Sequence, residues 1–227
     1  MSALTFTLKS RLGQIQLGKI NCSRLTPNEL AGLSLTQIQN LRLSNSYPIK
    51  VADYFDVSGT DSSHIIFKNS NIQLENIGHQ MAFGQITVES DCGDFVGANM
   101  QGGTIICHGN AGDRLGDKMR RGLILIDGNA GSYCASRMVA GSIGVYGHVG
   151  SYVGFGMKRG TVLFTKTPSL HATIQDCGTH TLPFLALLYQ SFKAFPSKFS
   201  TLENQRVQRF AGDLACNGNG EILVLKL

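Results

Sequence analysis

Residues 85–160 consist of four consecutive 19-residue segments: QITVESDCGDFVGANMQGG (85–103), TIICHGNAGDRLGDKMRRG (104–122), LILIDGNAGSYCASRMVAG (123–141) and SIGVYGHVGSYVGFGMKRG (142–160). Each has a methionine three residues before its final glycine. A looser segment, Ile66–Gly84, precedes them with the same pair, so five methionines stand 19 residues apart: Met81, Met100, Met119, Met138 and Met157. Self-similarity at a short fixed period is typical of a solenoid, whose repeats bury apolar side chains by stacking on one another.

Each segment begins with a short strand. Its second and fourth positions are apolar and mostly β-branched, the pattern of a strand with one buried face. A small residue, another apolar residue and the methionine follow, which gives about five inward positions per coil. We expect the methionines to fill the core, because a flexible thioether packs well there. Glycines mark the corners, and Asn110–Gly112 and Asn129–Gly131 are predicted turns with a positive φ, which asparagine and glycine tolerate.

The period predicts an all-β-dominated fold: a right-handed parallel β-helix of 19-residue coils, with short N-terminal and C-terminal helices. Helical solenoids need apolar spacings of three and four, which the segments lack. Left-handed hexapeptide helices have periods in multiples of six. Equivalent residues of neighbouring coils would stack about 4.8 Å apart, so five coils make a rod of about 24 Å. We expect one structural domain in three parts: a cap region (1–60), the coils (61–165), and a C-terminal helix and closing strand packed on the solenoid (166–227).

The N-terminal part has its own local signals. The alternation over Leu4–Leu8 predicts a strand. Thr26–Glu29 and Ser34–Gln37 each have the pattern of a helix start, with a capping hydroxyl and a glutamate or glutamine three residues later. Residues Ile49–Val57 resume strand character and are expected to lead into the coils.

Downstream of the coils the sequence predicts one helix and a final strand. The apolar run Pro183–Phe192 indicates a helix of about three turns that covers a flank or an open end of the solenoid. Phe184, Leu188 and Phe192 are expected to expose an apolar docking surface. The stretch Phe210–Val224 is expected to be a turn that feeds a closing strand.

The composition excludes several classes of protein. With 42% hydrophobic and 15% charged residues, the chain is expected to be ordered. It contains no signal-peptide pattern and no run of 18 apolar residues, so we expect a cytoplasmic protein without a membrane partner. The net charge of +5 raises the question of nucleic acid. A basic face interleaved with aromatic residues is lacking, however, so no nucleic-acid partner is expected.

We find no catalytic or metal-binding constellation in the sequence. The six cysteines form no C-x-x-C pair and are expected to be reduced thiols, and the six histidines lack ligand spacing. His108 is expected to be a solvated outward side chain. The outward acids lie in two different columns of the repeat, with no long loops to build a cleft: Glu89 and Asp127, and Asp94 and Asp113. We therefore assign no catalytic residue and no metal ligand to this chain.

Charges beside the methionine corner are one-sided. Three columns adjoining the methionines contain six basic residues and no acid: Lys118, Arg120, Arg121, Arg137, Lys158 and Arg159. Like charges on neighbouring coils, about 5 Å apart, repel one another unless an anion neutralises them or water screens them. One interpretation is a solvated edge. The functional interpretation is a strip of basic residues that binds a polyanion.

Short phrases of the sequence resemble a known family. These are the coil phrase Gly-Asn-Ala-Gly followed by methionine and glycine, and the ending Ala-Gly-Asp-Leu-Ala with Gly-x-Gly-Glu-Ile-Leu-Val. They resemble the C-subunit family of formylmethanofuran dehydrogenase, including its relative in the bacterial formyltransferase/hydrolase complex of methylotrophs. The similarity runs from about residue 48 to the end. The glycine coils alone are also shared with the C-terminal β-helix domain of the glutamate synthase large subunit.

The resemblance implies a non-catalytic scaffold subunit in tetrahydromethanopterin-linked one-carbon metabolism and formaldehyde oxidation. Chemistry would reside on partner subunits of amidohydrolase-like, dehydrogenase-like and formyltransferase-like type. Those partners, and not this chain, would hold any zinc-type metal or molybdopterin. The complex would use a methanofuran-type formyl carrier, whose glutamate-rich tail is the natural polyanion for the six basic residues. The low charge fraction favours the bacterial complex, which releases formate.

Two alternatives from other classes stay open. The first is a bridging module of glutamate synthase type, which would co-purify with a glutamine amidotransferase. The second is an enzyme on the exterior of the β-helix, which the scattered acids disfavour. The sequence leaves open the direction of the reaction, the choice between a bacterial and an archaeal complex, and the stoichiometry.

Overall fold

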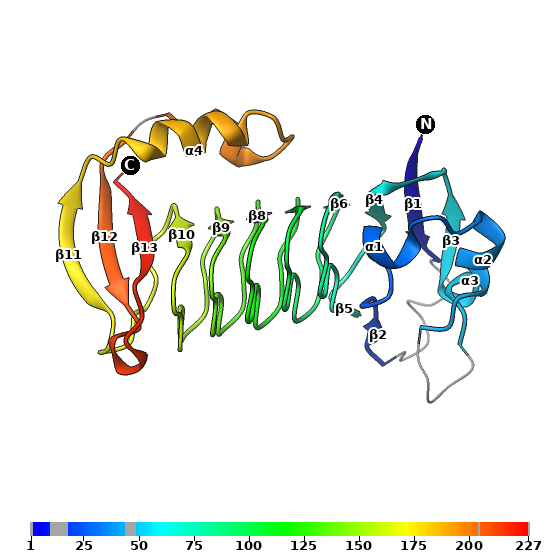
Figure 1. Ribbon diagram of the computed structural model, residues 1–227, viewed down its shortest axis with the longest axis horizontal. Helices are drawn as coiled ribbons and strands as arrows, with labels where there is room; N and C mark the ends of the chain where they lie inside the picture. The colour runs from blue at the N-terminus through cyan, green and yellow to red at the C-terminus, as the bar shows by residue number, and fades with distance from the viewer. Residues whose placement is uncertain (1, 10–17, 44–48, 204, 227) are drawn as a thin grey trace.

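The computed structural model describes residues 2–9, 18–43, 49–203 and 205–226, and strands dominate it (Figure 1). The strands of the main sheet are β1 (Ala3–Leu8), β3 (Phe55–Ser58), β4 (Asp61–Lys68), β6 (Gln85–Val88), β7 (Thr104–Cys107), β8 (Leu123–Ile126), β9 (Ser142–Val145), β10 (Thr161–Phe164), β11 (Gln175–His180), β12 (Val207–Gly212) and β13 (Gly220–Leu225). A small second sheet pairs β2 (Ile20–Asn21) with β5 (Leu74–Glu75). The helices are α1 (Pro27–Leu30), α2 (Leu35–Asn40), α3 (Val51–Tyr54), α4 (Phe184–Phe192), η2 (Lys198–Thr201) and η3 (Leu214–Cys216).

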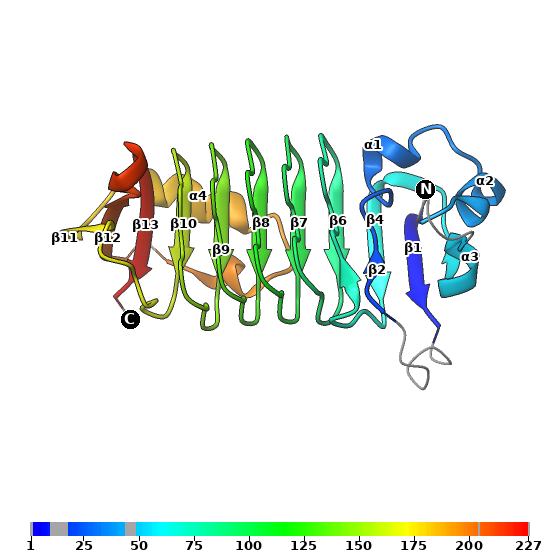
Figure 2. The same ribbon diagram turned by 90° about the horizontal axis from the view of Figure 1, so that it is seen from below.

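The main sheet has eleven strands in the order β11-β12-β13-β10-β9-β8-β7-β6-β4-β1-β3. Pairing is parallel from β1 through β4 and β6–β10 to β13, and antiparallel at both ends. Strands β6–β10 lie side by side along the long axis of the molecule, between α1–α3 at one end and β11–β13 at the other (Figures 1 and 2). The prediction of a sheet-dominated fold is thus confirmed, with a mostly parallel sheet and no closed barrel in the described part. The right-handed β-helix stays a prediction.

The 19-residue period is the pairing register of the sheet. Ile86 pairs with Ile105, Ile105 with Ile124, and Ile124 with Ile143. The equivalent side chains are buried, and the five methionines are each no more than 1% exposed. The prediction that the methionines fill the core is therefore confirmed.

The first coil is longer than the others. His64 pairs with Gln85, 21 positions further on, whereas strands β6 to β10 pair with one another at a distance of 19. The expected start at Ile66 was therefore wrong by two residues. By Leu74, whose carbonyl accepts from the N–H of Gly93, the spacing is again 19. The extra residues thus lie between Phe67 and Leu74, where Asn69 takes a positive φ of 53°.

The turns at Asn110–Gly112 and Asn129–Gly131 do not use a positive φ, contrary to the prediction. The asparagine side chains instead hold one coil to the next. The backbone N–H of Asn129 donates to Oδ1 of Asn110 (2.8 Å), and the N–H of His148 donates to Oδ1 of Asn129 (2.8 Å). Asparagine is selected here as an acceptor for a backbone donor that would otherwise be unpaired at the corner.

The N-terminal cap agrees with the sequence signals only in part. Strand β1 and helices α1 and α2 form where predicted, and Ser34 and Gln37 make a reciprocal capping box. Thr26 stands at the first cap, but its hydroxyl makes no capping bond and is buried without a partner. The strand predicted over Ile49–Val57 starts only at Phe55. Val51–Tyr54 is instead the helical turn α3, because Asp53 caps it by accepting from the N–H of Lys50 (2.7 Å).

Helix α4 covers a flank of the coils, as expected. Its buried residues join a second hydrophobic cluster on the outer face of the sheet, which includes Leu125 of β8, Leu163 of β10 and Leu223 of β13. Phe192 is only 1% exposed, so its prediction as a docking residue was wrong. Phe184 and Leu187 are the exposed apolar residues of this helix.

A glycine in the coils, Gly144, makes room for the C-terminal segment that contains η2. Gly144 in β9 pairs with Leu125 and Leu163, so it occupies the same outward column. A Cβ at Gly144 would lie 2.8 Å from Cζ of Phe199, a residue of η2 that is fully buried. The missing side chain therefore leaves the space into which the Phe199 ring packs.

Asp127 fastens the same segment. Its Oδ1 accepts from the N–H of Lys198 (2.8 Å), and its Oδ2 lies 2.9 Å from Nδ1 of His108. The Lys198 ammonium donates to the carbonyl of Asp127 (2.9 Å) and lies 5.4 Å from the centre of the Tyr146 ring. Asp127 and His108 were expected to be solvated, but Asp127 is only 5% exposed. The chain returns over them 71 residues later, which the local repeat does not encode.

The buried methionine register can be tested at Met119. We expect Met119→Asp to give no soluble folded protein, since it buries an unpaired charge in the middle of the coils. Met119→Leu is the matched control and should cost less than about 1.5 kcal/mol, because volume and apolarity are kept. Soluble yield and thermal unfolding by circular dichroism measure both. A soluble Met119→Asp protein with the parent melting temperature would contradict this register.

Candidate functional site: a basic strip beside an aromatic column

The six basic residues beside the methionines lie along one corner of the coils. We call them the basic strip: Lys118, Arg120, Arg121, Arg137, Lys158 and Arg159. All six are exposed, whereas the methionines of the same corner are buried. The repeat therefore turns each methionine inward and its charged neighbours outward, as the alternation of buried and exposed positions requires.

The corner that carries the basic strip has an uncommon backbone. In the coil Thr104–Gly122 positive φ angles occur at Arg114 (60°), Gly116 (66°), Lys118 (55°) and the final Gly122 (104°). For residues other than glycine such angles cost on the order of 1–3 kcal/mol and persist only where neighbours hold them. The next coil holds this corner, because the N–H of Lys118 donates to the carbonyl of Ser136 (2.9 Å). The side chains of the basic strip therefore project from a backbone that the next coil holds in place.

Arg137 does not belong to an open anion site. Its Nε and Nη2 donate to the two carboxylate oxygens of Asp117, at 3.0 and 2.7 Å, and Ser136 Oγ donates to the same carboxylate (2.6 Å). Asp117 is 4% exposed, so this bidentate pair is part of the packed corner. This pair was not predicted from the sequence, because Asp117 stands one column outside the three basic ones. The spacing of 19 between Asp117 and Ser136 was the available signal.

Lys158 is also engaged. Its ammonium donates to the carbonyl of Cys216 in η3 (2.8 Å), and its own carbonyl accepts from the N–H of Asn219. This lysine therefore joins the coils to the C-terminal end of the chain.

Four members of the basic strip have no side-chain partner among the described residues: Lys118, Arg120, Arg121 and Arg159. Three of them belong to the coil Thr104–Gly122, and Arg159 lies two coils further, about 10 Å along the rod. Unpaired cations on a rigid corner can bind an extended anion through contacts that salt weakens.

An aromatic column runs along the same corner, four residues before the first column of the basic strip. It consists of Phe95, Arg114, Tyr133 and Tyr152, at steps of 19 residues. The Arg114 guanidinium lies 5.8 Å from the centre of the Phe95 ring and 4.9 Å from that of Tyr133. The Tyr133 and Tyr152 rings stack at 4.9 Å with 14° between their planes. The expectation that aromatic residues are lacking beside the basic face was therefore wrong.

The six cysteines are all free thiols. Cys177 and Cys216 are partly exposed, whereas Cys22, Cys92, Cys107 and Cys134 are buried, and Cys92 and Cys107 lie with their Sγ atoms 3.6 Å apart. Burial raises the pKa of Cys134 to about 12 and that of Cys22 well above its usual range, so these thiols stay protonated. In the described part of the chain, no three histidine, cysteine, aspartate or glutamate side chains are placed to hold a metal ion. None of its helices has the length and apolarity to cross a membrane.

The geometry defines a protein of stacked, parallel-paired coils whose notable surface features are the basic strip and the aromatic column. Comparison with solved structures finds a similar chain in the crystal structure of the formyltransferase/hydrolase complex (FhcABCD) from Methylorubrum extorquens in complex with methylofuran. The two chains align with a TM-score of 0.70 and 29% sequence identity, over 98% of this chain and 100% of that one. No protein-family model and no curated protein sequence matches the chain.

The division of the basic strip into paired and unpaired residues predicts different effects on stability. Arg137→Gln should lower the free energy of unfolding by about 1–3 kcal/mol, because it leaves the buried Asp117 carboxylate without its main partner. Arg121→Gln, the matched control, should change it by less than about 0.5 kcal/mol. Urea denaturation followed by circular dichroism measures the difference. Equal effects of the two substitutions would show that the Asp117 pair contributes nothing.

Proposed function

We propose that this chain is the non-catalytic scaffold subunit, of the formylmethanofuran dehydrogenase C-subunit type, in a formyltransferase/hydrolase-like complex of one-carbon metabolism. The observation that carries the proposal is the end-to-end similarity to a chain of the FhcABCD complex, at a TM-score of 0.70 and 29% identity. The likeness covers all of that chain, so it extends beyond a shared repeat. The surface described above offers charged and aromatic contacts to partners and no constellation for chemistry.

On this proposal the stacked coils form a right-handed parallel β-helix in one structural domain. The N-terminal region (1–60) and the C-terminal region (166–227) cover the two ends and one flank of the coils (61–165). Capped ends suit a scaffold, since an open solenoid end exposes unpaired strands that recruit other chains.

The proposed partners are the amidohydrolase-like, dehydrogenase-like and formyltransferase-like subunits of a cytoplasmic complex. They, rather than this chain, would hold any metal and would act on a methanofuran-type formyl carrier. The solved complex contains methylofuran, which supports a carrier of this kind. A bridging module of glutamate synthase type would instead bring a glutamine amidotransferase, so the identity of the bound chains separates the two functions.

The basic strip has a proposed role within this function. Its four unpaired residues, on a corner held rigid by the coils, would bind the anionic tail of the carrier or an acidic face of a partner subunit. Arg137 and Lys158 would support the corner from inside the chain, because both already have protein partners.

The proposal predicts which proteins co-purify with the chain. Affinity purification of the tagged chain from its source, followed by mass spectrometry, should recover formyltransferase-like and amidohydrolase-like chains. The purified single chain should show no hydrolase, transferase or dehydrogenase activity on formylated carrier. Recovery of a glutamine amidotransferase, or activity from the chain alone, would overturn the scaffold assignment.

The role of the strip is tested by charge reversal. We expect the double substitution Arg121→Glu/Arg159→Glu to leave the melting temperature unchanged but to weaken carrier retention or subunit assembly at low salt. The matched control is Lys166→Glu/Lys193→Glu, which makes the same change of charge at two exposed lysines outside the strip. Native mass spectrometry reports assembly and carrier content. If both double variants assemble and retain carrier equally well at low salt, the strip is only a solvated edge.

A further inference from the structure

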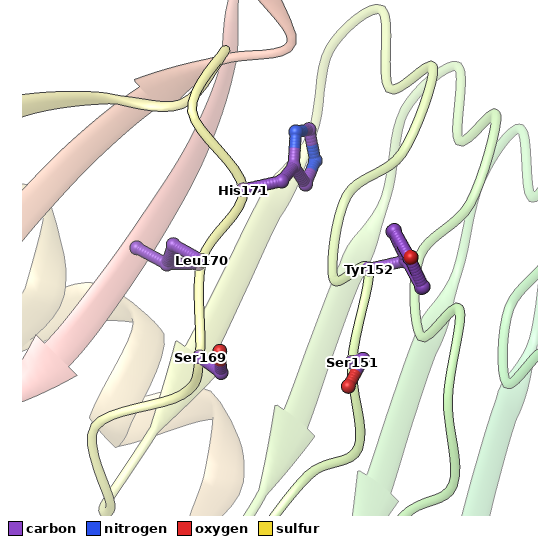
Figure 3. Close-up of a pocket in the computed structure, with 5 residues that line it drawn as sticks. All are labelled: Ser151, Tyr152, Ser169, Leu170 and His171. Atoms are coloured by element: carbon purple, nitrogen blue, oxygen red, sulfur yellow. The ribbon is translucent and has the colours of Figure 1, made fainter.

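The aromatic column ends at an incomplete position. Nineteen residues after Tyr152 stands His171, so the repeat would place an imidazole directly on the Tyr152 ring. The chain leaves the register there: His171 contacts Phe155 instead, with ring centres 6.2 Å apart. A hollow of about 220 Å³ opens in its place, lined by Ser151, Tyr152, Ser169, Leu170 and His171. Figure 3 shows the Tyr152 and His171 rings on opposite sides of this hollow.

One face of the Tyr152 ring is therefore unstacked. Tyr133 covers the other face at 4.9 Å, in the same way that Arg114 is held between Phe95 and Tyr133 earlier in the column. Tyr152 is 48% exposed, which is high for a ring packed in a ladder. A flat group placed in the hollow would continue the stacking series at the spacing that the coils already set.

At the hollow, Tyr152 lacks a backbone hydrogen bond that the equivalent residue of every earlier coil makes. At this position of the coil the N–H donates to a carbonyl of the following coil: Phe95 to Asp113 (2.9 Å), Arg114 to Ser132 (2.8 Å) and Tyr133 to Ser151 (2.8 Å). The N–H of Tyr152 has no such acceptor in the part of the chain that the structure describes. The missing acceptor belongs where the hollow lies, between this coil and the loop that carries Ser169 and His171.

His171 brings an unpaired ring nitrogen to the opposite wall. Its Nδ1 lies 2.7 Å from Oγ1 of Thr173, so one of its two ring nitrogens has a partner.

The other ring nitrogen of His171, Nε2, is buried and has no hydrogen-bond partner among the described residues. A buried polar atom without a partner is costly and is uncommon in native proteins. Phe155, which is half exposed, lies against the imidazole.

We propose that this hollow binds a small planar ring that carries a hydrogen-bond acceptor and a second polar group, of the heteroaromatic amide class. The ring stacks on the free face of Tyr152, its acceptor receives the Tyr152 N–H, and its second polar group pairs with Nε2 of His171. The hydroxyls of Ser151 and Ser169 suit polar substituents at the rim. A hollow of about 220 Å³ is smaller than a site for a drug-sized molecule, so one ring fills it. A cationic occupant is disfavoured, because no acid lines the hollow and the basic strip is near.

Nicotinamide is a suitable probe, since it combines a flat heteroaromatic ring with an amide. We expect titration of the full chain, followed by 1H–15N correlation NMR, to shift the Tyr152 amide signal saturably with a Kd in the millimolar range, as befits nine non-hydrogen atoms. Cyclohexanecarboxamide keeps the amide without the flat ring, so it should bind at least tenfold more weakly.

Two substitutions separate the contacts. Tyr152→Leu removes the stacking face and should abolish the saturable shift, monitored at the neighbouring Val153 and Gly154 amides. His171→Phe keeps a ring but removes the unpaired nitrogen and should raise Kd about tenfold, so the inference stays testable if one variant does not fold. Phe83→Leu, at an equally exposed aromatic residue outside the hollow, should leave Kd unchanged. An unsaturable Tyr152 shift, equal binding of cyclohexanecarboxamide, or parent affinity in Tyr152→Leu and His171→Phe would overturn the inference.

Discussion

The rest of the structure depends on backbone hydrogen bonds made between coils rather than within them. The N–H of Phe95 finds its acceptor on Asp113, and the N–H of Gly116 finds its acceptor on Val96, so each coil completes the bonding of its neighbours. One coil alone would leave nearly all of its polar backbone unpaired. This explains the constancy of the 19-residue period, because a residue added to one coil misaligns its bonds to the next unless a turn absorbs it, as between Phe67 and Leu74. It also explains Gly122, where a side chain would press against the carbonyl of Gly103, 2.7 Å away.

The coils could be predicted well from the sequence, but the C-terminal segments that pack on them could not. Strand register and methionine burial follow from the period, since stacking forces equivalent residues into equivalent places. Asp127 and Phe192 were misassigned because their burial comes from contacts far apart in the chain, which no local pattern contains. Asn110 and Asn129 were misread because the same residue types serve as left-handed turns or as acceptors, and only the neighbouring coil decides which.

The candidate site was predicted in part, for a similar reason. The exposure of the basic strip follows from its place beside an inward methionine. The division of the strip into paired and unpaired residues does not follow from it. Asp117 stands in another column, and Arg137 donates to it from the adjacent coil. The aromatic column was visible at steps of 19 residues but not recognised, since one of its four members is an arginine. On a stacked scaffold, charges that hold the corner and charges that face a partner can be neighbours in sequence and still have different roles.

The position of β13 has a consequence for how the molecule is made. Its strand lies against β10, yet 55 residues separate the end of one from the start of the other. During synthesis from the N-terminus, every coil can be laid on the one before it until β10, whose outer edge must then wait for β13. Through that interval the nascent protein carries an open parallel edge, the kind of surface that pairs with other chains. Residues 220–225 therefore close this edge only after the coils before it are in place, and a chain that stops before them would leave it open.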